Sequence, residues 1–415
     1  MKSILIIGAG SGQVPIIRKI QKMGHKALVV SREGPYPGFA EADLILPVDA
    51  YDTSAIVSAA KEHKVSAVLT CQSELLLRVA ASVAEELGLP GIPSSVLARI
   101  GDKAALREHC RSRGVQTPKY WHVSSLSDFL DILRNAEENL VVKPVDNSDS
   151  KGVQLLPHPR RMPSPHAENI YSESIQFSRL KQLLVEEYIT GQEVVVEGMV
   201  LNGKVTSLMI GESWNIDFPG CFVPSRRFFP AAISDDAVRS IYEIDALIYH
   251  GLGEFFSVTQ SEYIISAASG KIYLIDAHLR GGGAYIESHI IPLVTGLDAQ
   301  ERVVSAALGR RVEIPRDLTV RQHAGYVTFL LPKGRLLDTL DLGAVEKLPG
   351  VHYHGLRGLT AGREIPEAKN KSARFGPIVI RGDSRKDLCQ IRDNLKAMIK
   401  LRVETSDGIC GPHWE

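Results

Sequence analysis

The first 93 residues alternate short apolar strands with amphipathic helices, and this alternation constrains the fold more than any other feature. "SILIIGA" predicts a strand that runs into a turn containing Gly8, Gly10 and Gly12, followed by a helix at "QVPIIRKIQKMG". Further strands are expected at "HKALVVS", "ADLILPVD" and "VSAVLTC", and helices at "TSAIVSAAKEHK" and "ELLLRVAASVAEELG". Short apolar strands separated by helices pair in parallel. The sequence therefore predicts a doubly wound parallel sheet over residues 1–93.

The glycine turn allows two interpretations. A dinucleotide-binding turn needs a third glycine or alanine and an acid about 20 residues further on. This chain has Gln13 at the third position, and Ser31 and Arg32 at the end of the second strand. Arg32 could pair with the 2′-phosphate of NADP, so an NADP-dependent oxidoreductase is one alternative. The other is a tight strand-to-helix turn that uses glycine for its positive φ, and we favour it.

Length and composition limit the class of protein. A chain of 415 residues is too long for one core, so two or three domains are expected. Lys plus Arg and Asp plus Glu number 48 each, which argues against nucleic acid or an anionic membrane as a partner. The chain has no apolar run near about 18 residues, no signal peptide pattern and no paired cysteine spacing. These features predict a cytoplasmic protein with reduced thiols.

A different pattern begins near residue 120. It predicts strands at "KYWHV", "NLVVKPV" and "VQLLP" around a helix at "LSDFLDILRNA". Residues 157–172 are rich in proline and charge, so we expect an exposed, mobile insertion there. Strands dominate after residue 183, with a helix at "SDDAVRSIYEIDALIYHGLG" before strands at "EYIISAAS" and "KIYLIDAHL". A third unit is expected from about residue 316, ending in a helix at "SRKDLCQIRDNLKAMIKLRV".

Two stretches bring basic residues next to a small polar loop. "ARIGDKAALREHCRSRGVQTP" contains Lys103, and "NLVVKPVDNSDSKGV" places Lys143 at the end of a predicted strand. Ser150, Lys151 and Gly152 follow in a loop whose backbone N–H groups could close over phosphates. Each lysine alone is typical of a solvated surface.

A third stretch, "SEYIISAASGKIYLIDAHLRGGG", carries two acids on neighbouring strands. Glu262 and Asp276 flank a Ser-Gly turn, and paired carboxylates in such a hairpin can hold magnesium. His278 and Arg280 follow Asp276 at intervals of two, which puts all three on one strand face. Two lysines, a phosphate-type loop, two acids and an arginine together indicate chemistry on ATP.

This combination resembles the ATP-grasp ligases over roughly the full length of the chain. The similar segments are "GDK…LR…GV.TP", "VVKPV…S.SKGV", "LLVEEYITGQEVVVEG" and "YLIDAHLRGGG". The resemblance implies an α/β and α+β protein in three parts. These are an N-terminal Rossmann-like domain over residues 1–93 that binds no dinucleotide, an ATP-grasp domain over residues 94–315 with a lid at about 118–190, and a C-terminal domain over residues 316–415.

The resemblance assigns ATP-binding roles by position. Two lysines would neutralise the phosphates, a loop would cover them, and the strand after the lid would meet adenine and ribose. The residues concerned are Lys103, Lys143, Ser150, Lys151, Gly152, Glu186, Ile189 and Glu193. Among them, Glu186 and Ile189 would meet the adenine edge, and Glu193 would take the ribose hydroxyls.

The resemblance also assigns metal and catalytic roles. Glu262 and Asp276 would bind Mg²⁺ or Mn²⁺, and Arg280 would stabilise charge on the transferred phosphoryl group. Two positions depart from the family. Asp276 stands where glutamate is common, and His278 stands where asparagine is common. Because magnesium favours oxygen ligands, His278 either alters the metal site or acts on the substrate.

The resemblance implies an ATP-dependent carboxylate–amine ligase that forms an acyl phosphate and releases ADP and phosphate. The C-terminal segment resembles that of L-amino-acid ligases in the biotin-carboxylase-like branch, so amino-acid substrates and a homodimer are expected. Arg226, Arg227 and Glu287 are candidates for substrate binding, although a solvated turn and the start of a helix are simpler interpretations. A non-catalytic ATP-binding module is a further alternative, because Asp276 and His278 depart from the family.

His352 and His354 share one strand face in "VHYHG". Two histidines without a third ligand nearby are more often packed or solvated than metal-bound. We therefore expect no metal site there.

Overall fold

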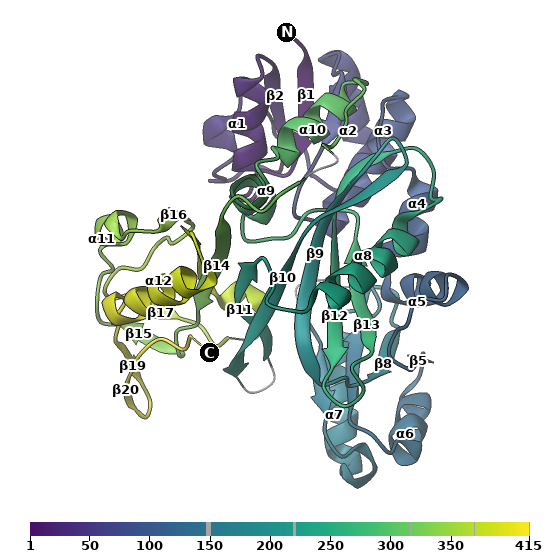
Figure 1. Ribbon diagram of the computed structural model, residues 1–415, viewed down its shortest axis with the longest axis vertical. Helices are drawn as coiled ribbons and strands as arrows, with labels where there is room; N and C mark the ends of the chain where they lie inside the picture. Colours follow the sequence, from purple (N-terminus) through teal and green to yellow (C-terminus); the bar gives the residue numbers. More distant parts are fainter. Residues whose placement is uncertain (147–150, 219–220, 316–317, 369, 415) are drawn as a thin grey trace.

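The computed structural model describes all residues except 147–150, 219–220, 316–317, 369 and 415. Four parallel strands form the N-terminal sheet in the order β3-β2-β1-β4. They are β1 (Ser3–Ile7), β2 (Lys26–Val30), β3 (Leu44–Leu46) and β4 (Ala67–Leu69). One face packs on α1 (Val14–Lys22), and the other on α2 (Thr53–Glu62) and α3 (Glu74–Leu87). The predicted doubly wound sheet is confirmed, and it forms the top of the molecule in Figure 1.

The glycine turn after β1 is filled by the chain's own side chains. Gly8 has φ +101°, and an added Cβ would lie 2.8 Å from Cδ1 of Leu76. Buried Gln13 donates from Nε2 to the Cys71 carbonyl at 2.8 Å. Arg32 pairs with Asp49 at the surface, 3.4 Å away. This packing is what a purely structural turn requires.

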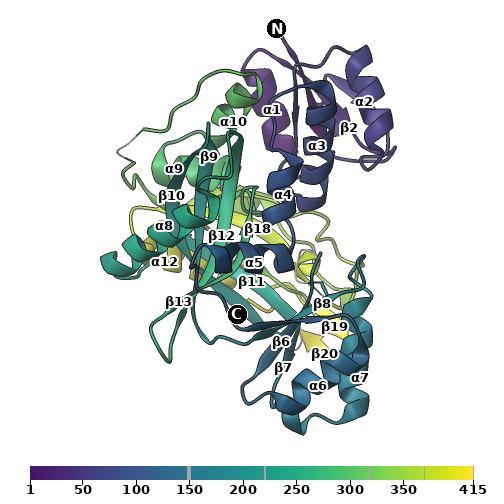
Figure 2. The ribbon, with the colours of Figure 1, turned by 90° about the vertical axis from the view of Figure 1, so that its right-hand side faces the viewer.

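A small antiparallel sheet with two helices follows, and we name residues 118–190 the lid unit after its predicted role. Its strand order is β5-β8-β6-β7. The strands are β5 (Tyr120–Val123), β6 (Leu140–Pro144), β7 (Gln154–Leu156) and β8 (Leu183–Glu187), and the helices are α6 (Leu126–Asn135) and α7 (Ser164–Ile175). Two helices, α4 (Ser94–Ile100) and α5 (Lys103–Ser112), connect this unit to the N-terminal sheet. Figure 2 shows the lid unit at the foot of the molecule.

Residues 157–172 are mostly exposed, as expected, but they form regular structure. A 3-10 turn at Pro159–Arg161 leads into α7, whose first turn contains a proline, a residue that favours that position. Ala167, Ile170 and Ser174 are buried, and the first two join the apolar core of the lid unit. This narrow buried face recurs at helical spacing, but the surrounding prolines and charges obscured it in the sequence.

Eight antiparallel strands form the central sheet, in the order β13-β12-β9-β10-β11-β14-β18-β16. They are β9 (Gly191–Leu201), β10 (Lys204–Phe218), β11 (Cys221–Phe229), β12 (Phe256–Ser266), β13 (Ile272–His278), β14 (His323–Phe329), β16 (Val351–His354) and β18 (Phe375–Gly382). Strand β11 pairs with β14, with Arg226 opposite Val327. The C-terminal segment therefore extends the central sheet through β14, β18 and β16.

The remaining elements cover this sheet. They are α8 (Asp235–Tyr249), α9 (Ile291–Thr295), α10 (Ala299–Ala307), α11 (Leu342–Lys347), α12 (Arg385–Met398) and a small sheet of β15 (Gly334–Leu336), β17 (Glu364–Ile365), β19 (Val403–Thr405) and β20 (Gly408–Cys410). Helix α10 lies beside the N-terminal unit in Figure 1 and packs on both α1 and β12. Ile16 of α1 and Val303 of α10 therefore share one core with Val258 of β12. In the part of the chain that the structure describes, every helix is too short or too polar to cross a membrane.

Candidate active site

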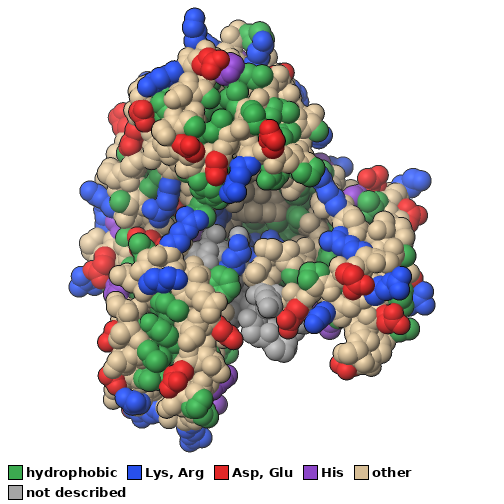
Figure 3. All heavy atoms as spheres, turned by 180° about the vertical axis from the view of Figure 1, so that it is seen from behind, with side chains coloured by type: hydrophobic (Ala, Val, Ile, Leu, Met, Phe, Trp, Pro, Cys, Tyr) green, Lys and Arg blue, Asp and Glu red, His purple; other side chains and the backbone are tan. Residues whose placement is uncertain are grey.

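A cavity of about 170 Å³ lies where the lid unit, the central sheet and the C-terminal segment meet. Figure 3 shows the face opposite to that of Figure 1, which is hollowed between these parts, with lysine and arginine side chains near the rim. Eleven of the predicted site residues line the cavity. They are Lys103, Lys143, Lys151, Glu186, Ile189, Glu193, Arg227, Glu262, Asp276, His278 and Arg280. The fold thus brings together residues from six strands, one helix and the connections between them.

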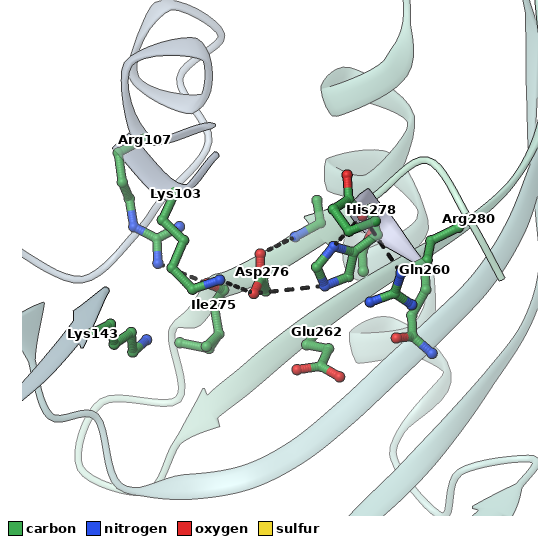
Figure 4. Close-up of polar contacts among 12 residues, drawn as sticks. Lys103, Arg107, Lys143, Gln260, Glu262, Ile275, Asp276, His278 and Arg280 are labelled. Atoms are coloured by element: carbon green, nitrogen blue, oxygen red, sulfur yellow. Dashed lines mark hydrogen bonds and ion pairs between the residues drawn. The ribbon is translucent and has the colours of Figure 1, made fainter. Parts of the chain in front are cut away.

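Glu262 on β12 lies directly opposite Asp276 on β13 in the strand register. Arg227 donates from Nη2 to Oε1 of Glu262 at 2.5 Å, and Lys103 donates from Nζ to Oδ2 of Asp276 at 2.8 Å. Figure 4 shows both carboxylates on the same side of the hairpin. The predicted pairing of two acids on adjacent strands is confirmed.

Both acids are ionised at neutral pH. Burial raises the pKa of Glu262, but Arg227 and then Lys371 outweigh it and lower this pKa to about 2. Burial likewise raises the pKa of Asp276, but Lys103 and His278 hold it well below its ordinary value. Two ionised carboxylates fit Mg²⁺, which prefers oxygen ligands and keeps further positions for phosphate or water. The described residues contain no group of three His, Cys, Asp or Glu that could hold a metal ion, so these two acids would be the protein's share of such a site.

Lys143 is held in place by a buried ion-pair network. Glu186 on β8 accepts from Nζ of Lys143 and from Nε of Arg107, each at 2.6 Å. Arg107 also donates to the carbonyl of Ile275 on β13, 2.7 Å away. Burial raises the pKa of Glu186, but the two cations outweigh it and lower this pKa to about 2. The Glu186 carboxylate, predicted to face adenine, is thus engaged with two cations of the chain.

Arg107 was missed in the sequence although a signal was present. It follows Lys103 by four residues on α5, so both side chains leave the same helix face. Arg107 is the largest side chain that is fully buried in the described protein. An arginine is buried in this way only when its charge is paired.

Ile189 and Glu193 lie at the strand connection that follows the lid unit. Ile189 is buried at the cavity wall, and Glu193 accepts from Nδ2 of Asn215 at 3.0 Å. Burial, and then the nearby Glu262 carboxylate, raise the pKa of Glu193 above its ordinary value. Asn215, on β10, was not identified from the sequence. This end of the cavity combines an apolar wall with a carboxylate acceptor.

His278 and Arg280 lie at the end of β13 and contact a residue from the N-terminal unit. His278 Nε2 lies 3.6 Å from Oδ2 of Asp276, and its Nδ1 lies 3.3 Å from Oε2 of Glu74. Arg280 Nε lies 3.5 Å from the same Glu74 oxygen. Burial raises the pKa of Glu74, but His278 and then Arg280 outweigh it and lower this pKa. No local pattern in the sequence distinguishes Glu74 from an ordinary acid at the start of a helix.

A buried acid fixes the glycine run that follows Arg280. Glu197 on β9 accepts from Nε2 of Gln260 at 2.6 Å and from the backbone N–H of Gly282 at 3.1 Å. A Cβ on Gly282 would lie 2.1 Å from Nε2 of Gln260, so only glycine fits there. Burial raises the pKa of Glu197 to about 7, with these hydrogen bonds opposing the rise. Figure 4 shows Gln260 close to Arg280.

Several predicted residues do not line this cavity. Arg226 lies over the Trp214 ring, 4.2 Å from its centroid, because successive strand residues point to opposite faces. Glu287 is buried beside a second cavity that Arg280 also lines, and burial raises the pKa of Glu287 to about 7. Ser150 lies outside the described residues. Gly152 has φ +73° and packs against Phe177 and Pro144.

The two histidines of β16 have different surroundings. The ring of His352 lies 5.4 Å from that of His289, and His354 Nε2 lies 3.2 Å from Oε1 of Glu346. Burial, and then Arg381, lower the pKa of His352. His352 is exposed, whereas the side chain of His354 is 10% exposed.

Sequence comparisons agree with this arrangement. Residues 101–216 match the family model described as phosphoribosylglycinamide synthetase, ATP-grasp (A) domain. The chain is 26% identical over 294 residues to alanine–anticapsin ligase from Bacillus subtilis, and the match covers 66% of this chain. It spans 60% of the length of that relative.

Structural comparisons extend over the whole chain. L-amino acid ligase from Bacillus licheniformis matches with a TM-score of 0.80 at 20% identity, over 97% of this chain and 98% of that one. Phosphoribosylglycinamide synthetase from Anaerococcus prevotii matches with a TM-score of 0.72 at 18% identity, over 99% of each chain. Residues 101–216 thus match an ATP-grasp domain, and the whole chain has the fold of these two solved structures.

Proposed function

We propose that this protein is an ATP-dependent carboxylate–amine ligase that joins two amino acids through an acyl phosphate. The observation that carries the proposal is the pairing of Glu262 with Asp276 in one cavity with Lys103, Lys143 and Arg280. Ionised acids beside several cations suit a metal-bound triphosphate. The ligase activity named for Bacillus subtilis and Bacillus licheniformis relatives supports an amino-acid substrate.

In the proposed complex, ATP would lie along the cavity with its adenine toward the strand connection after the lid unit. Adenine would pack at Ile189, and Glu193 would accept hydrogen bonds from the ribose hydroxyls. Lys143, Lys103 and Lys151 would then lie along the phosphates, where their charges offset those of the nucleotide. A Mg²⁺ ion held by Glu262 and Asp276 would neutralise phosphate charge when bound.

The proposed reaction has two steps. A carboxylate oxygen of the first amino acid attacks the terminal phosphorus of ATP, the bond from that phosphorus to the bridging oxygen breaks, and ADP leaves. The amine nitrogen of the second amino acid then attacks the acyl carbon. The carbon–oxygen bond to phosphate breaks, phosphate leaves, and the amine loses a proton. Arg280 stabilises the charge on the transferred phosphoryl group because its planar cation spreads over several oxygens.

His278 has a positioning role in this proposal. Its ring lies between Glu74 and Asp276, so each nitrogen faces a carboxylate. Magnesium favours the oxygens of Asp276 over a ring nitrogen. We infer that His278 orients Asp276. The predicted cytoplasmic location and homodimer stay predictions.

The test is product analysis with the purified protein. It is incubated with ATP, Mg²⁺ and pairs of amino acids, and ADP release and new masses are followed. We expect ADP release that requires both amino acids and yields a condensed dipeptide, and omission of either amino acid is the control. Release of ADP without a condensed product, or stabilisation against heat by NADP but not by ATP, would contradict the proposal.

A further inference from the structure

Glu74 joins the N-terminal unit to the end of β13. Its Oε2 lies 3.3 Å from Nδ1 of His278 and 3.5 Å from Nε of Arg280. This oxygen is shielded from solvent, and the side chain is 12% exposed. His278 and Arg280 line the main cavity, whereas Glu74 is not among its lining residues. Glu74 therefore contacts these two side chains from behind and does not face a bound nucleotide.

The helix α3 fixes the position of Glu74. The helix begins at Glu74, because the Ser73 side chain accepts a hydrogen bond from the N–H of Leu76. A carboxylate in the first turn is stabilised by the helix dipole. One turn further on, Leu77 and Ala81 share a buried cluster with Leu279, which lies between His278 and Arg280. Packing thus holds the start of α3 against the strand end that carries these two residues.

The Arg280 guanidinium is held at two points. Its Nε faces Glu74, and its Nη1 donates to the carbonyl of Gly281 at 3.1 Å. An arginine side chain has several rotatable bonds, and fixing it before the substrate binds lowers the entropy lost in the transition state. Two fixed points determine the direction in which its remaining N–H groups face.

We propose that Glu74 is a positioning residue that aims Arg280 at the terminal phosphate of ATP. The proposal rests on the function proposed above, because it assumes that Arg280 meets that phosphate. In this account the N-terminal unit takes part in phosphoryl transfer without touching the nucleotide. Glu74 does so by holding a cation that the central sheet supplies.

The test compares the affinities of ADP and a non-hydrolysable ATP analogue, each with Mg²⁺. Wild type should bind the analogue more tightly than ADP, because only the analogue has the phosphate that Arg280 meets. In Glu74→Gln we expect this preference to fall about tenfold, the scale of one lost charge-assisted contact, with ADP affinity unchanged within about twofold. In an Arg280→Ala background, Glu74→Gln should leave the preference unchanged, because no guanidinium remains to be aimed.

Glu86→Gln is the matched control, since Glu86 is an exposed residue on the same helix. It should leave both affinities at the wild-type values. If Glu74→Gln prefers the ATP analogue over ADP as strongly as the wild type does, the proposal is overturned. Equal weakening of ADP and analogue binding in this variant would also overturn it, because that result indicates a merely structural role. Failure of the wild type to bind either nucleotide would instead overturn the proposed function, and this inference with it.

Discussion

Two charged networks border the cavity, and they differ in how completely they are enclosed. In the first, Arg107 and Glu186 are 0% exposed and Lys143 is 11% exposed, and the Glu186 carboxylate accepts two short hydrogen bonds. In the second, the side chains of Asp276, His278 and Arg280 are 14–17% exposed, and the contacts with His278 and Arg280 are 3.3–3.6 Å long. The first network is closed, whereas the second is looser and open to the cavity.

The difference separates two uses of charge. A closed buried network fixes the relative position of two elements, here α5 and β8, and losing one member leaves a buried charge without its partner. A looser network retains capacity to bind a ligand, because its members keep unused hydrogen-bonding groups. We therefore expect changes in the first network to reduce stability and changes in the second to reduce turnover.

Removing Arg107 should have the largest effect. Arg107→Met leaves Glu186 buried with Lys143 as its remaining cation, and we expect the free energy of unfolding to fall by about 3 kcal/mol. Urea denaturation measures the change. Arg111→Met is the matched control, because Arg111 is exposed on the same helix and should change stability by less than about 0.5 kcal/mol. Equal stability of the two variants would contradict the expectation that the closed network stabilises the protein.

Removing Arg280 should affect turnover more than binding. Arg280→Ala should lower kcat about 100-fold, the scale of one lost group that stabilises transition-state charge. ADP affinity and the melting temperature should stay near the wild-type values. Steady-state kinetics and calorimetry measure these quantities. The exposed Arg311 provides a control variant, Arg311→Ala. A parallel loss of ADP affinity and turnover would assign Arg280 to the structural network.

Lys143 belongs to the closed network and also faces the cavity. Its removal should therefore affect both the stability of the protein and the binding of ATP. Lys143→Met should weaken ATP binding about tenfold, since one charge-assisted contact to phosphate is lost. It should also lower stability, because Glu186 loses one of two cations. Lys119→Met, on the exposed side of the lid unit, should change neither. Unchanged ATP affinity in Lys143→Met would contradict the assignment of this lysine.

Glu287 gives the smallest expected effect and tests a buried acid outside both networks. Burial raises its pKa in the folded protein to about 7. The unfolded chain ionises near its ordinary pKa of about 4.3, so stability should fall as pH rises between these two values. Glu287→Gln cannot ionise, so its unfolding free energy relative to wild type should increase by about 1 kcal/mol from pH 5 to pH 6. A pH-independent difference in urea midpoints would show that this carboxyl is already ionised in the folded state.

The sequence predicted contacts between residues that lie close together in the chain. Glu262 and Asp276 flank one turn, so the hairpin register that pairs them follows from their spacing. The sequence did not predict contacts between distant segments. Glu74 reaches Arg280 only because α3 packs against the end of β13, and Arg107 reaches Glu186 although 79 residues separate them in the chain.

Two further features of the fold do not follow from local sequence patterns. Helix α7 buries only a narrow face, so its sequence is mostly polar and was interpreted as an insertion. The C-terminal strands join the central sheet through pairing of β11 with β14, which local patterns do not specify.

The acyl-phosphate route is tested most directly by oxygen transfer. The first amino acid is supplied with ¹⁸O in its carboxylate, together with ATP, Mg²⁺ and the second amino acid, and the released phosphate is analysed by mass spectrometry. The account predicts one ¹⁸O atom in each phosphate, because the carboxylate oxygen that attacks phosphorus leaves with it. Phosphate without ¹⁸O, or label in AMP, would contradict it.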